Sequence, residues 1–177
     1  MTDQELVDLI RSLLCRRLGT EEAAALVRTM VARRVPAGGI ICGEGEETTG
    51  LVLLLTGAAE VLKRGRDGGG AERLATVDAP SVLGEMGLLL DGGRHTATVR
   101  AQTECELRVL PKGEFVRLLE AEDVGAYKLV ATIAEVLARR LSLMDDKVLE
   151  LTRRGDPLAP VEELAAFRQK LFTEWRF

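Results

Sequence analysis

Apolar residues near the start of the chain recur every three or four positions, which is the period of an amphipathic helix. The first such group follows Thr2 and Glu5, whose spacing matches an N-terminal capping box, and it continues to Leu18. The second group runs from Thr20, a suitable N-cap residue, to Arg34. The pattern therefore predicts two helices at the N-terminus.

The pattern changes in residues 35–111, where short apolar runs are separated by glycines. Residues 51–55 are continuously apolar, like a strand buried on both faces, and residues 105–109 alternate apolar and charged side chains, like a half-buried strand. The glycines at 68–70 indicate the tip of a hairpin. These features predict a mainly β protein, a barrel or sandwich with flanking helices.

Helical periodicity returns after residue 111, first in a short helix and then in a long one over about residues 124–154. The long helix carries a narrow apolar seam, which either packs on the chain's own barrel or pairs with another helix. A helix of about 30 residues is about 45 Å long, more than a small barrel covers, so we expect a homodimer formed through this helix. The seam consists of Val130, Ile133, Leu137, Leu141, Met144, Val148 and Leu151.

The end of the chain follows a Gly-Asp-Pro sequence at 155–157 that breaks the long helix. We expect a terminal helix there, docked by the aromatic side chains of Phe167, Phe172 and Trp175. The expected organisation is N-terminal helices (residues 1–34), a β-barrel (35–111), a short and a long helix (112–154) and a C-terminal helical appendage (155–177).

Composition excludes several classes of protein. The 177 residues are 46% apolar and 29% charged, and 28 acidic against 24 basic side chains give a net charge of −4, so neither disorder nor a polybasic nucleic-acid binder is indicated. A membrane-spanning helix needs about 20 apolar residues, far more than any run here. The start of the chain also lacks the pattern of a secretory signal. We therefore expect a cytoplasmic protein that does not contact a membrane.

Metal and enzyme chemistry have little support. The three cysteines, Cys15, Cys42 and Cys105, are far apart in the sequence, and His95 is the only histidine. A disulfide framework or a multi-histidine metal site is therefore not expected, and the thiols should be reduced and buried. Neither a serine-nucleophile elbow nor a Walker-type phosphate loop is present. We expect a protein that is not an enzyme.

The most informative stretch is residues 84–98, which reads GEMGLLLDGGRHTAT. A single helical turn between Gly84 and Gly87 presents free backbone N–H groups, and a following arginine or hydroxyl adds donors, so the stretch is typical of a phosphate cradle. Glu85 lies where it could accept a hydrogen bond from a sugar hydroxyl.

This stretch resembles the phosphate-binding cassette of cyclic nucleotide-binding domains, the sensors of the bacterial catabolite activator and of kinase regulatory subunits. The resemblance extends over roughly residues 20–153 and implies a β-barrel of the double-stranded β-helix, or jelly-roll, type. The further segments that carry it are residues 35–38 (VPAG), 43–46 (GEGE), 53–57 (LLLTG), 105–110 (CELRVL) and 138–141 (ARRL).

The resemblance also implies contacts to a cyclic nucleotide, cAMP or alternatively cGMP. Glu85 would bind the ribose 2′-hydroxyl. The cyclic phosphate would lie against Gly84, the amides of Met86 and Gly87, and Thr96 and Ala97.

One departure concerns the cation opposite the phosphate. The family has an arginine two residues before the alanine that ends the cassette, and this chain has His95 there. Arg94 is one residue earlier. Two alternatives follow: Arg94 reaches round from the flexible Gly92-Gly93 turn, or the imidazole of His95 replaces the arginine.

A second departure lies on the long helix. The family positions that contact the purine are Met144 and Asp145 here, and these residues either contact the base or serve as a seam residue and a solvated carboxylate. By resemblance, Arg140 links the helix to the cassette through an ion pair with Glu85.

Three functional hypotheses remain open. The first is a cyclic nucleotide sensor that acts on an unknown downstream partner through ligand-dependent movement of its C-terminal helix. The second is a degenerate family member, an interaction dimer that no longer binds nucleotide. The third is a transcription regulator whose DNA-binding domain is missing, because only 26 residues follow Leu151 and a winged helix needs more than about 30. Direct nucleic-acid binding is not expected.

Overall fold

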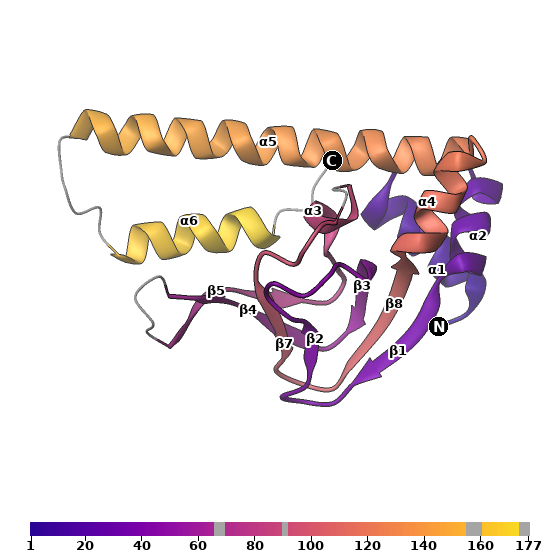
Figure 1. Cartoon of the computed structure of the whole chain (residues 1–177), viewed down its shortest axis with the longest axis horizontal. Helices are drawn as coiled ribbons and strands as arrows, with labels where there is room; N and C mark the ends of the chain where they lie inside the picture. The colour runs from indigo at the N-terminus through magenta and orange to yellow at the C-terminus, as the bar shows by residue number, and fades with distance from the viewer. Residues whose placement is uncertain (66–69, 90–91, 155–160, 174–177) are drawn as a thin grey trace.

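The chain forms two β-sheets with helices packed at one end and a long helix crossing above them (Figure 1). The computed structural model describes residues 1–65, 70–89, 92–154 and 161–173. Its strands are β1 (Val31–Val35), β2 (Ile40–Cys42), β3 (Gly50–Thr56), β4 (Ala58–Arg64), β5 (Ala71–Asp78), β6 (Ser81–Leu83), β7 (Thr98–Ala101) and β8 (Cys105–Pro111). In the described ranges they form two antiparallel four-stranded sheets, ordered β1-β8-β3-β6 and β2-β7-β4-β5. The predicted mainly β, jelly-roll fold is confirmed.

Strand β3 shows why residues 51–55 are continuously apolar. Val52 and Leu54 point between the two sheets, whereas Leu51 and Leu53 point toward the helices, and all four side chains are buried. A strand buried on both faces has no need for polar alternation. The predicted hairpin tip at 68–70 falls mostly outside the described residues, but β4 and β5 on either side of it pair antiparallel.

The first helix begins where the sequence predicts. The amide of Glu5 donates to Thr2 Oγ1 at 3.2 Å and the amide of Thr2 donates to Glu5 Oε2 at 2.7 Å, which is the predicted capping box. The α-helix α1 (Asp3–Leu9) continues as a turn of π-helix (Ile10–Leu14), so the helical segment ends four residues before Leu18.

The prediction of a second helix reaching Arg34 is wrong. Helix α2 spans Thr20–Thr29, with Gly19 rather than Thr20 as its N-cap residue, and residues 31–35 form β1. Strand β1 pairs with β8 along its whole length, and Arg34 forms an ion pair with Glu106 of β8 at 2.7 Å. This pairing with a strand more than 70 residues later outweighs the local helical pattern. Such a long-range pairing cannot be recognised from the segment alone.

Two hydrophobic cores hold the fold together. One fills the space between the two sheets, and the other lies between the β3 side of the barrel and the helices, around Phe115, Leu129 and Ile133. All three cysteines are buried and unpaired, as predicted. The second core fixes the N-terminal half of the long helix on the barrel.

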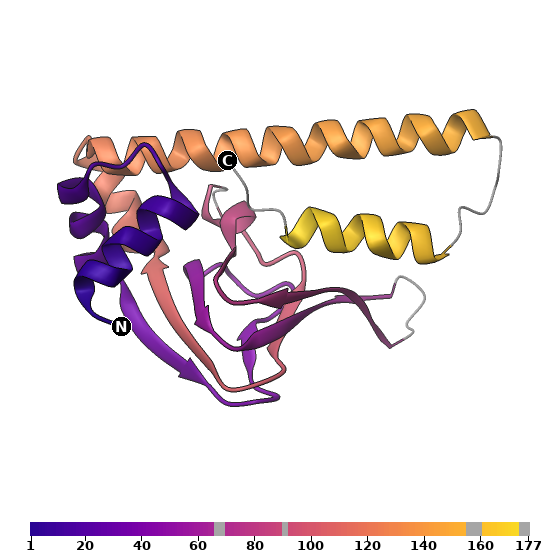
Figure 2. The same ribbon diagram turned by 180° about the vertical axis from the view of Figure 1, so that it is seen from behind.

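The C-terminal half of the chain contains α4 (Lys112–Glu120), α5 (Val124–Arg154) and α6 (Val161–Thr173). Helix α5 is the predicted long helix, and its last turns extend beyond the barrel, with α6 lying between them and strand β5 (Figures 1 and 2). No helix in the described ranges is long and apolar enough to cross a membrane. Of the predicted docking aromatics, Phe167 is half-buried, whereas the side chain of Phe172 and residue Trp175 lie outside the described part.

The predicted apolar seam of α5 divides into two parts. Its first three residues pack against the core of the same chain, with Ile133 fully buried and the other two half-buried. Leu151 at the far end is half-buried, and the residues between are exposed: Leu141 (60%), Met144 (48%) and Val148 (59%). Only this exposed middle section is available to a second helix.

Candidate functional site

A cavity of about 60 Å³ lies where the cassette faces helix α5. Its lining comes from the end of β6, from α3 (Glu85–Leu88), from the segment that leads into β7 and from α5. It is lined by Cys42, Val61, Val82, Leu83, Gly84, Glu85, Met86, Gly87, His95, Thr96, Ala97, Val99 and Arg140. Eight of the eleven residues predicted from the sequence as ligand contacts therefore meet at one place.

Two glycines, Gly84 and Gly87, allow the backbone at α3 to lie close to residues 48–50. Gly84 has φ of +84°, and a Cβ added there would lie 2.8 Å from the carbonyl oxygen of Gly50. A Cβ at Gly87 would lie 1.7 Å from Thr48 Oγ1. No L-residue with a side chain fits either position without displacing its neighbour. These glycines let the turn pack directly against residues 48–50.

Glu85 and Arg140 form an ion pair across the cavity, as predicted. The glutamate side chain is 10% exposed and the arginine side chain 16%, so both charges are largely removed from water. Their separation in sequence is 55 residues, and the pair connects the cassette to helix α5. A charge-assisted contact in such a setting is strong and directional.

His95, not Arg94, lines the cavity. The His95 residue is 8% exposed, and its backbone exchanges hydrogen bonds with the loop before β3, from its amide to the Glu46 carbonyl (2.9 Å) and from the Gly45 amide to its carbonyl (2.8 Å). Burial lowers the pKa of His95 below its ordinary value, and the nearby charge of Glu46 opposes this only in part. The imidazole is therefore neutral near pH 7.

Arg94 points the other way. Its residue is exposed, its Nη1 donates to the carbonyl of Gly45 at 2.7 Å, and its backbone forms an isolated bridge with Glu47. Of the two alternatives for the phosphate cation, the structure thus places His95 at the cavity and uses Arg94 to fasten the loop.

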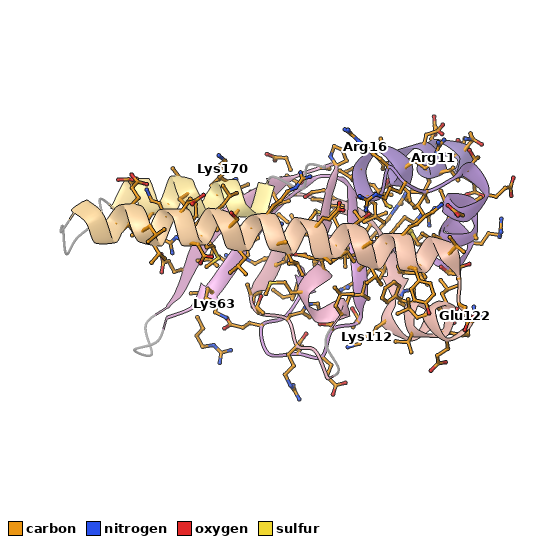
Figure 3. The ribbon with its side chains drawn as sticks, turned by 90° about the horizontal axis from the view of Figure 1, so that it is seen from above. Arg11, Arg16, Lys63, Lys112, Glu122 and Lys170 are labelled. Atoms are coloured by element: carbon orange, nitrogen blue, oxygen red, sulfur yellow. The ribbon has the colours of Figure 1, made fainter. Side chains whose placement is uncertain are left out.

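Lys63 and Glu44 support the far end of the cassette. Glu44 belongs to the 43–46 segment that carries the resemblance, but the sequence assigned it no contact, and Lys63 was not identified. The Lys63 ammonium donates to the carbonyl of Thr96 and lies 3.0 Å from Glu44, which also accepts from the Arg64 amide at 2.9 Å. Seen onto α5, Lys63 lies beside the helix on the barrel strands (Figure 3). Strand β7 pairs with both β2 and β4, and these two pairings bring Glu44 and Lys63 to the cassette.

Cys42 is a further lining residue that sequence reasoning treated only as a buried thiol. Burial raises its pKa to about 11, so it is a neutral thiol that adds apolar surface to the cavity. Among the described residues, no group of three or more His, Cys, Asp or Glu side chains could hold a metal ion.

Met144 and Asp145 are not brought to the cavity. Both are exposed on α5, one turn beyond Arg140, and neither belongs to the lining. Their positions match the alternative of a seam residue and a solvated carboxylate.

Comparison with known proteins identifies the family of this chain. The profile of the cyclic nucleotide-binding domain family matches residues 32–122. The chain is 35% identical over 102 residues to the cAMP-dependent protein kinase regulatory subunit of Yarrowia lipolytica, a match covering 58% of this chain and 26% of that protein. It is 30% identical over 145 residues to glutaminase 2 of Bradyrhizobium diazoefficiens, covering 82% of this chain and 22% of that protein.

The fold comparison extends further along the chain. The structure of the Thermus thermophilus catabolite activator protein is similar with a TM-score of 0.65 and 27% identity, over 89% of this chain and 80% of that one. The chain spans about a quarter of the length of the two curated relatives above. Since the family profile covers more than half of the residues, including the whole cassette, the chain belongs to the cyclic nucleotide-binding domain family.

Proposed function

We propose that this chain is a regulatory sensor module that binds a cyclic nucleotide, cAMP first and cGMP as the alternative, in the cavity between α3 and α5. The observation that carries the proposal is the Glu85–Arg140 pair. It joins Glu85, the carboxylate among the described lining residues, to the helix whose movement would signal occupancy. The phosphate would lie against the amides of the α3 turn and Thr96, and the ribose 2′-hydroxyl would donate to Glu85.

Ligand entry requires a rearrangement of this pair. Glu85 and Arg140 both line the cavity, and each is the ion-pair partner of the other. The ribose would reach Glu85 only if Arg140 yields part of its contact. Binding would therefore favour a shifted position of α5. The population of that position would increase according to how much more tightly the ligand binds it than the unshifted position.

The exposed section of α5 supports a homodimer. Leu141, Met144 and Val148 are spaced three and four residues apart and form one apolar stripe, which is the spacing of paired helices. The partner chain would cover this stripe through a two-fold axis. Replacing Leu141 and Val148 by glutamate should convert the dimer to monomer in sedimentation velocity, while Ser142→Glu, an exposed position on another face, should not.

A second candidate, an interaction dimer without nucleotide binding, is favoured by the charges of the cavity. Among the described lining residues, Arg140 alone carries a permanent positive charge, and it is paired with Glu85. The lowered pKa of His95 leaves the position opposite the phosphate uncharged at neutral pH. An anionic ligand therefore meets less positive charge than an arginine in that position would supply.

Thermal unfolding with and without 1 mM cAMP or cGMP separates the two candidates. A ligand at one hundred times its dissociation constant stabilises the folded state by about 2.7 kcal/mol, which raises the Tm by about 5–11 °C for a chain of this size. The shift should disappear in Glu85→Ala and persist in Glu47→Ala, whose exposed carboxylate lies outside the cavity lining. No shift of the parent protein with either nucleotide would leave the interaction dimer as the function.

A further inference from the structure

Helix α6 is attached to the edge of the barrel by the side chain of Gln169, which forms the hydrogen bonds that a neighbouring strand would otherwise form. Strand β5 is the last strand of its sheet, so half of its backbone groups have no strand partner. The Gln169 amide satisfies both groups of Thr76: Nε2 donates to the Thr76 carbonyl at 2.6 Å, and Oε1 accepts from the Thr76 amide at 2.8 Å. Arg168 adds an ion pair with Glu72 at 2.7 Å.

The same helix is fastened to α5 through Lys147. The side chain of Lys147 is only 12% exposed; it contacts the carboxylate of Glu163 on α6 and lies 3.0 Å from Glu150 on its own helix. Its Nζ also lies 6.0 Å from the centroid of the Phe167 ring. Helix α6 is thus held on two sides, by β5 and by α5, and it lies between them in both views (Figures 1 and 2).

The contacts between α5 and α6 involve the part of α5 that lies beyond the hydrophobic core. Val136 is the last fully buried residue in the described part of α5. Beyond it, the helix is fixed by Arg140 on the cassette and by Lys147 on α6. These two residues are seven positions apart on the helix, about 10 Å along its axis. A movement of α5 that withdraws Arg140 from the cavity must therefore also strain or break the contacts with α6.

We propose that α6 is an autoinhibitory strap that holds α5 in the position where Arg140 occupies the nucleotide cavity. Gln169 fixes the strap to the barrel, and Glu163 fixes α5 to the strap. Nucleotide binding then has to overcome the strap contacts in addition to the Glu85–Arg140 pair, so the strap lowers nucleotide affinity. This inference rests on the proposed function and adds the element that regulates the same site.

The test uses the full chain with the strap released by Glu163→Gln together with Gln169→Ala. Dissociation constants for cAMP and cGMP are measured by isothermal titration calorimetry in the parent and the variant. Release should tighten nucleotide binding three- to tenfold, because contacts that hold Arg140 in the cavity are lost. The control is Glu47→Gln together with Gln102→Ala, two exposed residues of the same types outside the strap, and its affinity should equal that of the parent.

A second measurement shows whether the strap has been released. Amide hydrogen exchange at Thr76 should be at least tenfold faster in the variant, because its N–H then loses the Gln169 acceptor. Lys147→Met, which removes the α5 side of the strap only, should also tighten binding. Unchanged or weaker affinity with accelerated exchange would overturn the strap while leaving the nucleotide site intact. Absence of binding in the parent and in both released variants would instead overturn the proposed function and the strap's role with it.

Discussion

The Glu85–Arg140 pair can be weighed by a double-mutant cycle in the unliganded protein. The single changes are Glu85→Gln and Arg140→Met, which remove one charge each while keeping similar side-chain volume. Either change leaves the other charge in a setting where the side chains are only 10% and 16% exposed. Removing both charges leaves no buried ion, and a buried pair replaced in this way costs little or nothing.

The expected magnitudes follow from that exposure. Loss of one partner of a fully buried pair costs about 3–5 kcal/mol, and the residual exposure here reduces the expected cost to about 2 kcal/mol for each single variant. The double variant should lose about 1 kcal/mol, so the coupling free energy is about 3 kcal/mol. In thermal unfolding, each single variant should melt about 4–8 °C below the parent.

Urea unfolding at pH 7 and at one fixed protein concentration measures the four free energies, because the stability of any dimer depends on concentration. Arg117→Met with Glu114→Gln provides the control cycle, since this exposed pair on α4 should couple by less than about 0.5 kcal/mol. If the costs of Glu85→Gln and Arg140→Met add to that of the double variant within about 0.5 kcal/mol, the pair does not connect the cassette to α5 and the proposed mechanism loses its basis.

Three further predictions concern the cassette. Gly87→Ala should lower stability by about 1–3 kcal/mol in urea unfolding, because its Cβ would overlap Thr48, whereas Gly113→Ala on α4, where nothing lies within 4 Å, should be neutral or stabilising. Since burial lowers the pKa of His95 below 6.5, the unfolded chain binds a proton that the folded chain does not, so stability should decrease below pH 6.5 and decrease less in His95→Gln. In calorimetric titrations, cAMP affinity should rise as the pH falls from 8 to 6 in the parent, and His95→Arg should bind more tightly without this pH dependence.

Local patterns predicted the parts of the molecule whose structure is set by neighbouring residues. The capping box at Thr2 and the helix over residues 124–154 depend on contacts within one turn or on one periodicity. The apolar run at 51–55 also identified a core strand correctly. The pattern failed at residues 31–34, where a helical period was fulfilled by chance and pairing with β8 decided the structure.

The candidate site also contains residues that the sequence predicted and residues that it did not. The resemblance covers a contiguous cassette, whose Gly84 and Glu85 line the cavity, and it predicted the ion pair of Glu85 with Arg140. It did not identify Lys63, which reaches the cassette only because β4 pairs with β7. Helix α6 was expected to dock through aromatic side chains, yet the contacts that fasten it to β5 come from Gln169 and Arg168. Hydrogen bonds to a sheet edge leave no periodic signal in the sequence.

The distribution of charge makes Arg140 the residue that couples ligand binding to the movement of α5. The barrel supplies the cavity with a carboxylate and a neutral imidazole, and Arg94 is committed to the outer loop. Among the described lining residues, the one permanent cation is Arg140 of α5, and its partner is Glu85. In a cassette with its own permanent cation, the phosphate could bind with little demand on this helix. Here the ribose and Arg140 compete for the same carboxylate, Glu85, so occupancy of the cavity and the position of α5 are expected to change together.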